Sequence, residues 1–321
     1  MLILFPFGEM MDSKFFKKID TFKIITMPSI IVVFSLMVAM LGTYLIYAEP
    51  AISKYGINLF IQNIWVASEE ASKEVYGLAA PIWGSIFVAI LAVLVSLPMA
   101  ICYAIFVNDY APKKIKYPLI IISDIMAGLP TIVYGIWGAL ILVPILRDTV
   151  MTFLHDNFSF IPFFSYPPLS GYSFMAAGVL LGIMVTPFAA AIIREAYGMI
   201  PSVYKEGLVA MGATKYETTK ILIGYVKPAI ISGTILAFGR ALGETVAVSL
   251  VIGNSFNLSA QLFAPGYTIS SLIANQYGNA ALYESMTSVL YAAGLVLFVV
   301  GLIVNIIGLY YLKRWRENVQ H

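Results

Sequence analysis

Six long apolar runs dominate this 321-residue sequence and restrict what it can fold into. Each run is long enough to cross a bilayer, because a membrane-spanning helix needs about 20 apolar residues. The segments of about ten residues with alternating polarity that mark a membrane β-barrel are missing. The sequence therefore predicts an all-α, polytopic membrane protein with six transmembrane helices. The predicted spans are residues 24–47, 82–107, 117–146, 172–193, 226–252 and 286–312.

The composition agrees with a bilayer protein and excludes several other classes. Only 11% of the residues are charged, whereas a soluble domain carries about 25%. The net charge of +2 gives no electrostatic footprint for nucleic acid, so membrane lipid is an expected partner and nucleic acid is not. Cys102 is the single cysteine, and His155 and His321 lie far apart, so we expect no disulfide framework, no metal site and no cofactor.

The distribution of Lys and Arg predicts the orientation, since basic residues near short flanks stay on the cytoplasmic side. With the N-terminus inside, 15 of the 19 basic residues lie on the cytoplasmic side. The outer side holds only Lys54, Lys73 and Arg147, and Arg240 lies within a span. We therefore expect a cytoplasmic (inner) membrane protein with both termini in the cytoplasm.

The sequence predicts four parts of the chain: a short N-terminal segment, a first helix with an external loop, a membrane core and a short tail. Phe15, Ile19 and Phe22 share a helical face beside basic residues, which suits an interfacial amphipathic helix. An ordinary basic flank explains them equally well. The first apolar run lacks a small-residue cleavage site and is interpreted as a retained anchor. The predicted parts are a cytoplasmic segment 1–23, the first helix and external loop 24–81, a core 82–312 with a cytoplasmic loop 194–225, and a tail 313–321.

Glycine and proline predict where helices bend or pack closely. Gly128 and Pro130 interrupt the third predicted span, which we expect to kink or to be discontinuous. Gly239, Gly243 and Ala247 recur at four-residue spacing in the fifth, and small residues let helices approach in a membrane. Such a stripe packs either within the chain or against a second membrane subunit. The outer stretch 253–285 is expected to be a surface loop, with a partial dip into the membrane as the alternative.

Two ionisable residues, Arg240 and Glu244, fall inside the fifth predicted span. A charge at mid-membrane costs about 2.5–3.5 kcal/mol of insertion free energy, so such residues indicate a structural or functional role. Their i, i+4 spacing predicts one shared helical face, on which they neutralise each other. Asp124, near the inner end of the third span, is a further candidate partner. The face is either an internal salt bridge or part of a hydrophilic pathway in which Arg240 attracts a tetrahedral oxyanion.

The cytoplasmic loop 194–225 predicts two short helices with defined ends. Ser202 is a candidate N-cap for the first helix, and Gly212 suits a left-handed turn at its end. Thr214 and Glu217 have the spacing of a capping box that opens the second helix. The loop is interpreted as a docking knob for another protein or as a compact connection. DNA binding is disfavoured for a tethered segment of modest charge.

These segments carry a resemblance to a known family. The run from Glu206 to Thr214, Glu-Gly-Leu-Val-Ala-Met-Gly-Ala-Thr, resembles the EAA loop of ABC importer permeases. The run Gly239-Arg-Ala-Leu-Gly-Glu-Thr-Val-Ala-Val, followed by Ile252-Gly-Asn, is similar to the phosphate-specific permeases of the Pst system, and closer to the PstC type than to the PstA type. The similarity in motif order extends over residues 82–312. Gly207 replaces the usual first alanine, and Gly224-Tyr225 replaces the usual Leu-Pro.

The resemblance implies a MetI-like type I importer fold and an ATP-driven importer of inorganic phosphate. It implies four kinds of partner: a homologous PstA-like permease, two PstB-like ATPases, a PstS-like phosphate-binding protein and phosphate. The sequence has no phosphate-binding loop for ATP, so it is expected to be a transport subunit and no enzyme. The residues that the resemblance assigns to the ATPase-coupling loop are Glu206, Gly207, Ala210, Gly212, Ala213 and Thr214. Those assigned to the translocation pathway are Arg240, Glu244, Thr245 and Asp124.

Two rival functions stay open at the level of sequence. The same fold imports other oxyanions, such as molybdate, tungstate or sulfate. An ion-coupled carrier or channel without an ATPase is the rival from another class. Co-purification with an ATPase subunit separates these classes.

Overall fold

The computed structural model describes residues 21–319, with side chains described at 26–308 and at 310. The described residues divide into two compact units, with the boundary between Ile46 and Tyr47. The helix α1 (Thr21–Tyr55) begins in the first unit and ends in the second. Within the first unit, most described side chains of α1 are apolar and exposed, as expected of a helix in lipid. The predicted amphipathic segment 1–23 lies almost wholly outside the described residues.

Five described helices are long and apolar enough to cross a membrane, and a bent helix pair adds a sixth candidate. The five are Thr26–Tyr55, Ala79–Tyr110, Thr131–Phe158, Phe174–Gly198 and Met286–Gly308. The pair consists of α10 (Lys215–Tyr225) and α11 (Lys227–Gly243), which meet at 64°. The all-α class is thus confirmed, and the differences from the predicted spans concern the third and the fifth.

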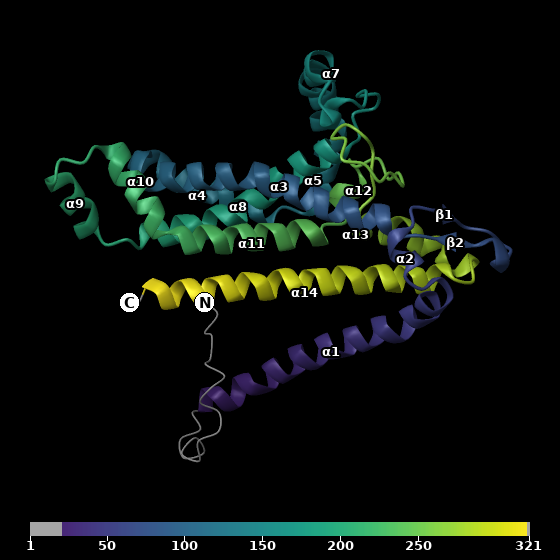
Figure 1. Cartoon of the computed structure of the whole chain (residues 1–321). Helices are drawn as coiled ribbons and strands as arrows, with labels where there is room; N and C mark the ends of the chain where they lie inside the picture. Colours follow the sequence, from purple (N-terminus) through teal and green to yellow (C-terminus); the bar gives the residue numbers. More distant parts are fainter. Residues whose placement is uncertain (1–20, 320–321) are drawn as a thin grey trace. The chain divides into compact units, whose positions relative to one another are not determined.

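The core of the second unit is a bundle of long helices (Figure 1). The helix α3 (Ala79–Ile105) packs along α8 (Phe174–Gly198), and α11 packs against both of them and against α14 (Met286–Val319). Two glycines of α8 permit the close approach to α3. A Cβ atom at Gly178 would lie 2.5 Å from the Cβ atom of Leu91, and one at Gly182 would lie 2.6 Å from that of Val95. This glycine pair therefore packs within the chain.

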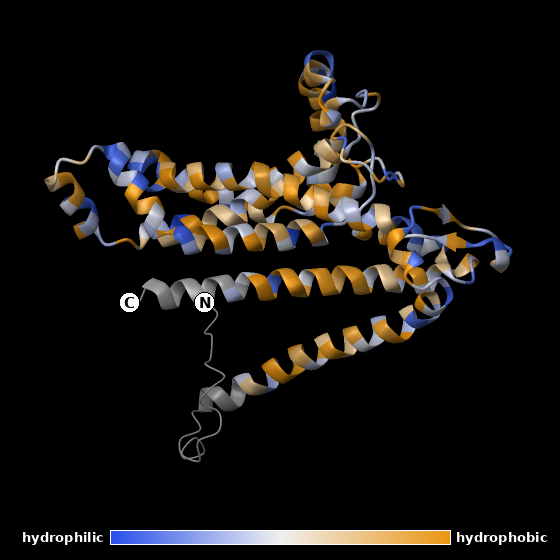
Figure 2. Cartoon of the chain, viewed as in Figure 1, coloured by the Kyte–Doolittle hydropathy of each residue, from blue (hydrophilic) through white to orange (hydrophobic). Residues whose placement is uncertain are grey.

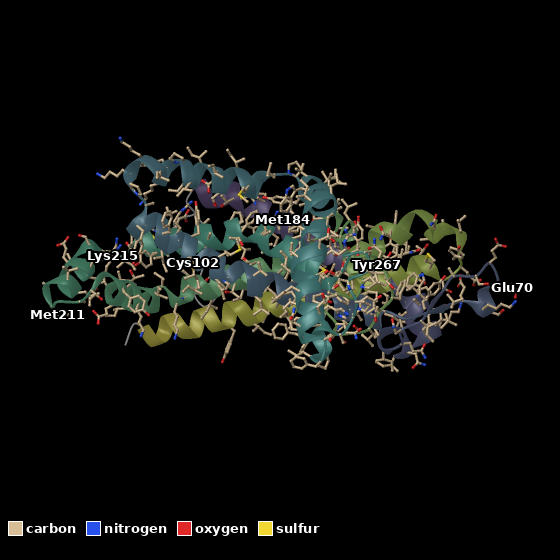
Figure 3. All side chains as sticks on the ribbon, turned by 90° about the horizontal axis from the view of Figure 1, so that it is seen from above. Glu70, Cys102, Met184, Met211, Lys215 and Tyr267 are labelled. Carbon is tan, nitrogen blue, oxygen red and sulfur yellow. The ribbon has the colours of Figure 1, made fainter. Side chains whose placement is uncertain are left out.

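The third predicted span, 117–146, is discontinuous, as the sequence predicts, but the helix long enough to cross the membrane begins only after the break. The chain forms α4 (Lys113–Gly128), breaks at Leu129–Pro130, and continues as a second helix over Thr131–Phe158. Proline restricts the preceding residue to extended backbone, which ends α4 there. Figures 1 and 3 both show the second helix running across the bundle. Its parts are α5 (Thr131–Trp137), η4 (Gly138–Leu142), α6 (Val143–Leu146), η5 (Arg147–Met151) and α7 (Thr152–Phe158).

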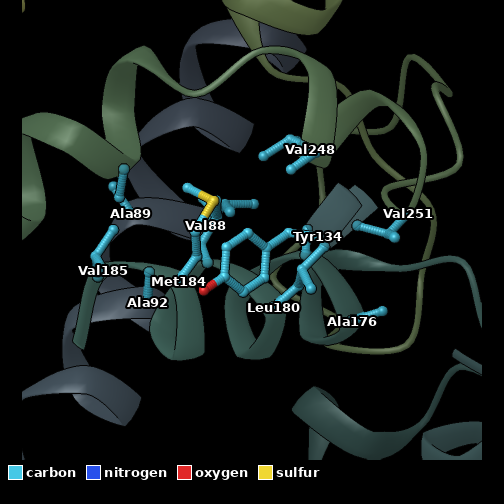
Figure 4. Packing of buried hydrophobic residues seen from close by; sticks show 14 of the residues in the cluster. Val88, Ala89, Ala92, Tyr134, Ala176, Leu180, Met184, Val185, Val248 and Val251 are labelled. Carbon is cyan, nitrogen blue, oxygen red and sulfur yellow. The ribbon is translucent and has the colours of Figure 1, made fainter. Parts of the chain in front are cut away.

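The fifth predicted span, 226–252, is also broken. The helix α11 ends at Gly243, and the short α12 (Val246–Ser249) follows after two residues. The two breaks lie close together, because α5 packs against α12: a Cβ atom at Gly135 would lie 3.0 Å from the Cα atom of Ala247. The Tyr134 hydroxyl also donates to the Met126 carbonyl at 2.9 Å, across the break in the third span. Figure 4 shows the Tyr134 ring packed among Val88, Leu180 and Met184.

One end of the second unit is a cap of short elements, shown to the right in Figure 1. Its two-stranded antiparallel sheet pairs Trp65 with Tyr76 and Val66 with Val75. The described elements of this cap are α2 (Asn58–Ile61), β1 (Trp65–Val66), η2 (Ala71–Lys73), β2 (Val75–Tyr76), α13 (Ile269–Gln276) and η7 (Tyr277–Leu282). A further short helix, η6 (Pro162–Phe164), follows α7.

The default expectation for the stretch 253–285, an ordinary surface loop, is wrong. Ile269 and Leu272 are buried, and the Ile269 backbone N–H donates to Ser85 Oγ of α3 at 2.9 Å. A Cβ atom at Gly84 would overlap the Tyr267 carbonyl oxygen, so glycine is required for this approach. The segment packs into the bundle, which is where irregular backbone at membrane depth is tolerated.

The opposite end carries the predicted loop helices, α9 (Ser202–Ala210) and α10. Figure 2 shows hydrophilic residues at this end, as at the cap, whereas the middle of α14 is apolar. The helix α8 ends at Gly198, immediately before this loop. The end of α3 lies elsewhere in the sequence, where the five residues Phe106–Tyr110 form a π-helical turn, η3.

Candidate translocation site and coupling loop

Arg240 lies in the last turn of α11 and faces α8. Its guanidinium carbon is 3.9 Å from the centre of the Phe188 ring, which is a cation–π distance. Its Nε atom is buried and has no hydrogen-bond partner. Among the described residues, no carboxylate lies within ion-pair distance of this guanidinium. Since buried N–H groups are almost always satisfied, this unpaired donor stands out as a site for an acceptor that the chain does not supply.

Glu244 is separated from Arg240 by the end of the helix. The prediction that both residues share one helical face is wrong, because α11 stops at Gly243 and Glu244 has extended backbone. Glu244 is 9% exposed, and its Oε1 atom accepts the Ala247 backbone N–H at 3.5 Å, at the start of α12. Its carbonyl oxygen accepts the Ser270 hydroxyl at 2.7 Å. The carboxylate therefore stabilises the turn into α12 and does not neutralise Arg240.

The other two candidate pathway residues differ in their surroundings. Thr245 follows the break, and its hydroxyl donates to the Gly243 carbonyl at 3.3 Å. Asp124 pairs with Arg194 of α8, with 3.7 Å between Oδ1 and Nη1. The structure thus brings Glu244 and Thr245 together, and it pairs Asp124 with a cation other than Arg240.

Sequence reasoning missed two residues that shape this site. Phe188 supports the guanidinium from α8, and Ser270 holds the Glu244 carbonyl from the segment that was expected to be a surface loop. Neither has a sequence signal, because each contact joins segments far apart in the chain. Pro187, next to Phe188 in α8, is visible in the sequence as a predicted bend of the helix. A proline does not indicate that the neighbouring ring packs on a cation.

The two helices of the coupling loop begin and end as predicted, except at the start of α9. Gly212 has a φ of +85°, the left-handed conformation that glycine favours. The Thr214 hydroxyl accepts the Glu217 N–H at 3.3 Å, and Glu217 Oε2 accepts the Thr214 N–H at 2.8 Å, so the capping box is confirmed. Ser202 is not the N-cap: Pro201 occupies that position, and no side chain caps α9.

The loop exposes the residues that were assigned to coupling. Glu206, Gly207, Ala210, Gly212 and Thr214 are exposed, and Ala213 is half-buried. Exposed apolar side chains lie beside them, with Val209 62% and Met211 77% exposed. Figure 3 places Met211 at the far end of the unit, beyond Lys215. An open groove of about 730 Å³ runs between the two helices. Its lining residues are Leu208, Met211, Gly212, Ala213, Glu217, Lys220, Ile221 and Gly224. Exposed apolar residues around a groove mark a protein-docking surface.

The fold of this chain resembles that of an ABC importer of known structure. The inward-facing MetNI methionine ABC transporter matches with a TM-score of 0.50 over 72% of this chain and 90% of that chain. The sequence identity is 17%, so this likeness concerns the fold alone. It defines the class of fold as a polytopic, all-helical membrane bundle of the type found in that importer.

Residues 100–317 match the family described as binding-protein-dependent transport system inner membrane component. A probable phosphate transport system permease protein PstC of Methanocaldococcus jannaschii is 77% identical over 308 residues, which are 96% of this chain and 98% of that protein. The phosphate transport system permease protein PstC of Xylella fastidiosa (strain 9a5c) is 39% identical over 254 residues, 78% of this chain and 76% of that protein. The chain belongs to this family and, within it, to the PstC-type phosphate transport permeases. It is thus a multi-pass inner-membrane transport subunit and not an ATPase.

Proposed function

We propose that this chain forms part of the route by which an ATP-driven importer moves inorganic phosphate across the cytoplasmic membrane. The Arg240 guanidinium, whose buried Nε atom has no hydrogen-bond partner, carries this proposal. A guanidinium presents a fixed fork of donors that matches a tetrahedral oxyanion, and it stays charged at any physiological pH. Stacking on Phe188 uses the face of the guanidinium and leaves the N–H groups at its edge for the anion.

Glu244 and Thr245 contribute to the same route by shaping its wall. Both lie at the break after α11, and the Glu244 carboxylate is a fixed negative charge beside the start of α12. A negative charge near the path weakens the hold of Arg240 on an anion, and a transported ion must be able to leave its site. Asp124, paired with Arg194, continues the charged surface toward the cytoplasmic end of α8.

A PstA-like permease is the partner that completes the route. Cβ atoms at Gly239 and Gly243 would meet nothing within 4 Å, so this face of α11 is open to a second subunit. Small residues permit close helix contact in lipid, where apolar burial gives no drive for association. The relatives belong to phosphate transport systems by name, which fits a shared route between two permeases.

Two PstB-like ATPases bind the coupling loops, and a PstS-like protein delivers phosphate at the outer cap. In this proposal the exposed residues of α9, with Glu206 and Gly207 among them, dock in a groove of the ATPase. The closing of the ATPases then moves the docked helices as rigid bodies and opens the route. Both termini lie in the cytoplasm, in agreement with the basic residues that gather at the α9–α10 side.

The test is ATP-dependent uptake of labelled phosphate by the complete complex in vesicles, with the binding protein present. We expect uptake that requires ATP hydrolysis and that unlabelled phosphate, but not molybdate or sulfate, suppresses. Preferential suppression by molybdate or sulfate would assign the complex to another oxyanion. Uptake that an ion gradient drives without ATP would overturn the proposal.

A further inference from the structure

Three consecutive residues of the π-helical turn η3 together contact three helices at the cytoplasmic end of the bundle. Asn108 contacts α8, Asp109 contacts α8 and α9, and Tyr110 contacts α10. Single π-helical turns within helices are frequent at functional positions. This one ends α3, whose other residues pack along α8 through the membrane.

Asp109 uses both carboxylate oxygens in these contacts. Lys205 Nζ of α9 donates to Oδ1 at 2.6 Å, and the Tyr197 hydroxyl of α8 donates to Oδ2. The side chain of Asp109 is 13% exposed and that of Lys205 is 32% exposed, so water screens this pair only in part. Tyr197 is fully buried, and the Lys205 ammonium also lies 4.9 Å from the centre of its ring.

The neighbours of Asp109 add two more connections. Asn108 Nδ2 donates to the Arg194 carbonyl at 2.9 Å, which fixes η3 to the end of α8. Lys215 Nζ lies 3.9 Å from the centre of the Tyr110 ring, at the start of α10. The turn therefore holds both helices of the coupling loop and the end of α8 at once.

The helix α9 has few other attachments. None of its residues is fully buried, so apolar packing alone holds it weakly. Among the described residues, Lys205 is the one side chain of α9 that makes a hydrogen bond or an ion pair. A force applied to α9 thus reaches the membrane bundle through the backbone at its ends, through the packing of Leu208 against the buried cluster around Tyr197, and through the Lys205–Asp109 pair. The pair is the polar side-chain route among these.

We infer that Asp109 is a positioning residue that transmits movement of the coupling helix α9 to α3 and α8 through Lys205 and Tyr197. This inference rests on the proposed function, since it concerns how ATP hydrolysis drives transport. The ion pair makes α9, η3 and the end of α8 move together. Without the pair, α9 moves with the ATPase while α3 lags behind, so ATP is hydrolysed without a matching transport step.

The experiment measures the number of ATP molecules hydrolysed per phosphate taken up by the complete complex in vesicles. We expect Asp109→Asn and Lys205→Gln each to raise this ratio at least threefold, while ATP hydrolysis per assembled complex stays within twofold. The charge-reversed pair Asp109→Lys with Lys205→Asp should return the ratio to within twofold of the unmodified complex, because the Tyr197 hydroxyl can accept from a lysine. Lys114→Gln is the matched control, since Lys114 is an exposed cation in the next helix, α4, with no ion pair among the described residues.

An unchanged ratio in both single variants would overturn the inference and leave the proposed function intact. A parallel fall in hydrolysis and uptake that follows loss of assembled complex would also overturn it, because the pair would then be structural. Tyr197→Phe, which retains the buried ring and removes one donor to Asp109, separates these outcomes: we expect a smaller rise in the ratio at full assembly. If the unmodified complex takes up no phosphate with ATP, the proposed function fails and the inference fails with it.

Discussion

The guanidinium of Arg240 packs on the ring of Phe188, with 3.9 Å between the guanidinium carbon and the ring centre. The contact joins the last turn of α11 to the middle of α8. It gives a charged side chain a fixed position near the break in a membrane span without neutralising its charge. A cation held in this way is available to an anion, whereas a cation in an ion pair is largely occupied.

Replacing the charge of Arg240 should stop transport without unfolding the subunit. We expect Arg240→Gln to lower ATP-dependent phosphate uptake at least tenfold, the loss expected of one charge-assisted hydrogen bond of about 1.5–3 kcal/mol. Arg240→Lys retains the charge and should keep part of the uptake. The measurement is uptake per assembled complex in vesicles. Near-normal uptake by Arg240→Gln would assign this residue a structural role.

Arg240 and Glu244 should act independently on stability. Glu244 accepts the Ala247 N–H and makes no ion pair with Arg240, so the effects of Arg240→Gln and Glu244→Gln on the free energy of unfolding should add to within about 0.5 kcal/mol. The check is a double-mutant cycle on thermal unfolding of the purified permease. A larger coupling energy would indicate that the two residues do pair.

Substitution of alanine for two glycines of the coupling loop should change the stability of the loop in opposite directions. A Cβ atom at Gly207 would meet nothing within 4 Å in this chain, so Gly207→Ala should stabilise α9 by about 1 kcal/mol through helix propensity. Gly212 has a φ of +85°, so Gly212→Ala should destabilise the loop by about 1–2 kcal/mol. Hydrogen exchange of the α9 amides measures both effects. Equal shifts in the two variants would contradict this explanation.

The start of α10 should lose stability in acid. The backbone N–H and the hydroxyl of Thr214 both donate to Glu217, which holds the pKa of this carboxyl below its ordinary value of 4.5. A group with a lowered pKa in the folded state stabilises the fold at pH values above its ordinary pKa and loses that contribution as the pH falls through the lowered value. The protection factors for hydrogen exchange at the first turn of α10 should therefore decrease at pH values below the ordinary pKa. In Glu217→Gln the same region should show no such pH dependence.

The buried Glu74 should be important for the stability of the cap of short elements. Its Oε2 atom accepts the Ser285 N–H at 3.1 Å and lies 3.7 Å from Lys54 Nζ. Because Glu74→Ala leaves a buried N–H unsatisfied, it should lower the free energy of unfolding by about 1–3 kcal/mol. The exposed Glu69 is the control, and Glu69→Ala should change it by less than about 0.5 kcal/mol. Equal melting temperatures for the two variants would argue against this role of Glu74.

Local signals in the sequence predicted the coupling loop well. The left-handed turn at Gly212 and the capping box of Thr214 and Glu217 depend on neighbouring residues, and both formed as expected. The Ser202 cap failed because the preceding Pro201 took the capping position. Asp109 and Lys205 lie far apart in the chain, so no pattern in either segment indicated that they pair.

Hydropathy predicted which segments enter the membrane and did not predict where they break. The run 226–252 is apolar on both sides of Gly243, so its composition hides the end of α11 and led to the wrong helical face for Glu244. Pro130 did predict the break in the third span. The direction of the helix Thr131–Phe158, which runs across the bundle, depends on packing against α12 and has no signal in the sequence. The burial of the stretch 253–285 likewise depends on partners in α3.

The two interrupted spans change how this subunit responds to lipid. The helices α4 and α11 have 16 and 17 residues, fewer than the roughly 20 that match the hydrocarbon thickness. Neither helix has to fit that thickness alone, because the chain continues into a further helix after each break. Hydrophobic mismatch is therefore borne by the uninterrupted helices α3 and α14, which accommodate a thicker or thinner bilayer by tilting.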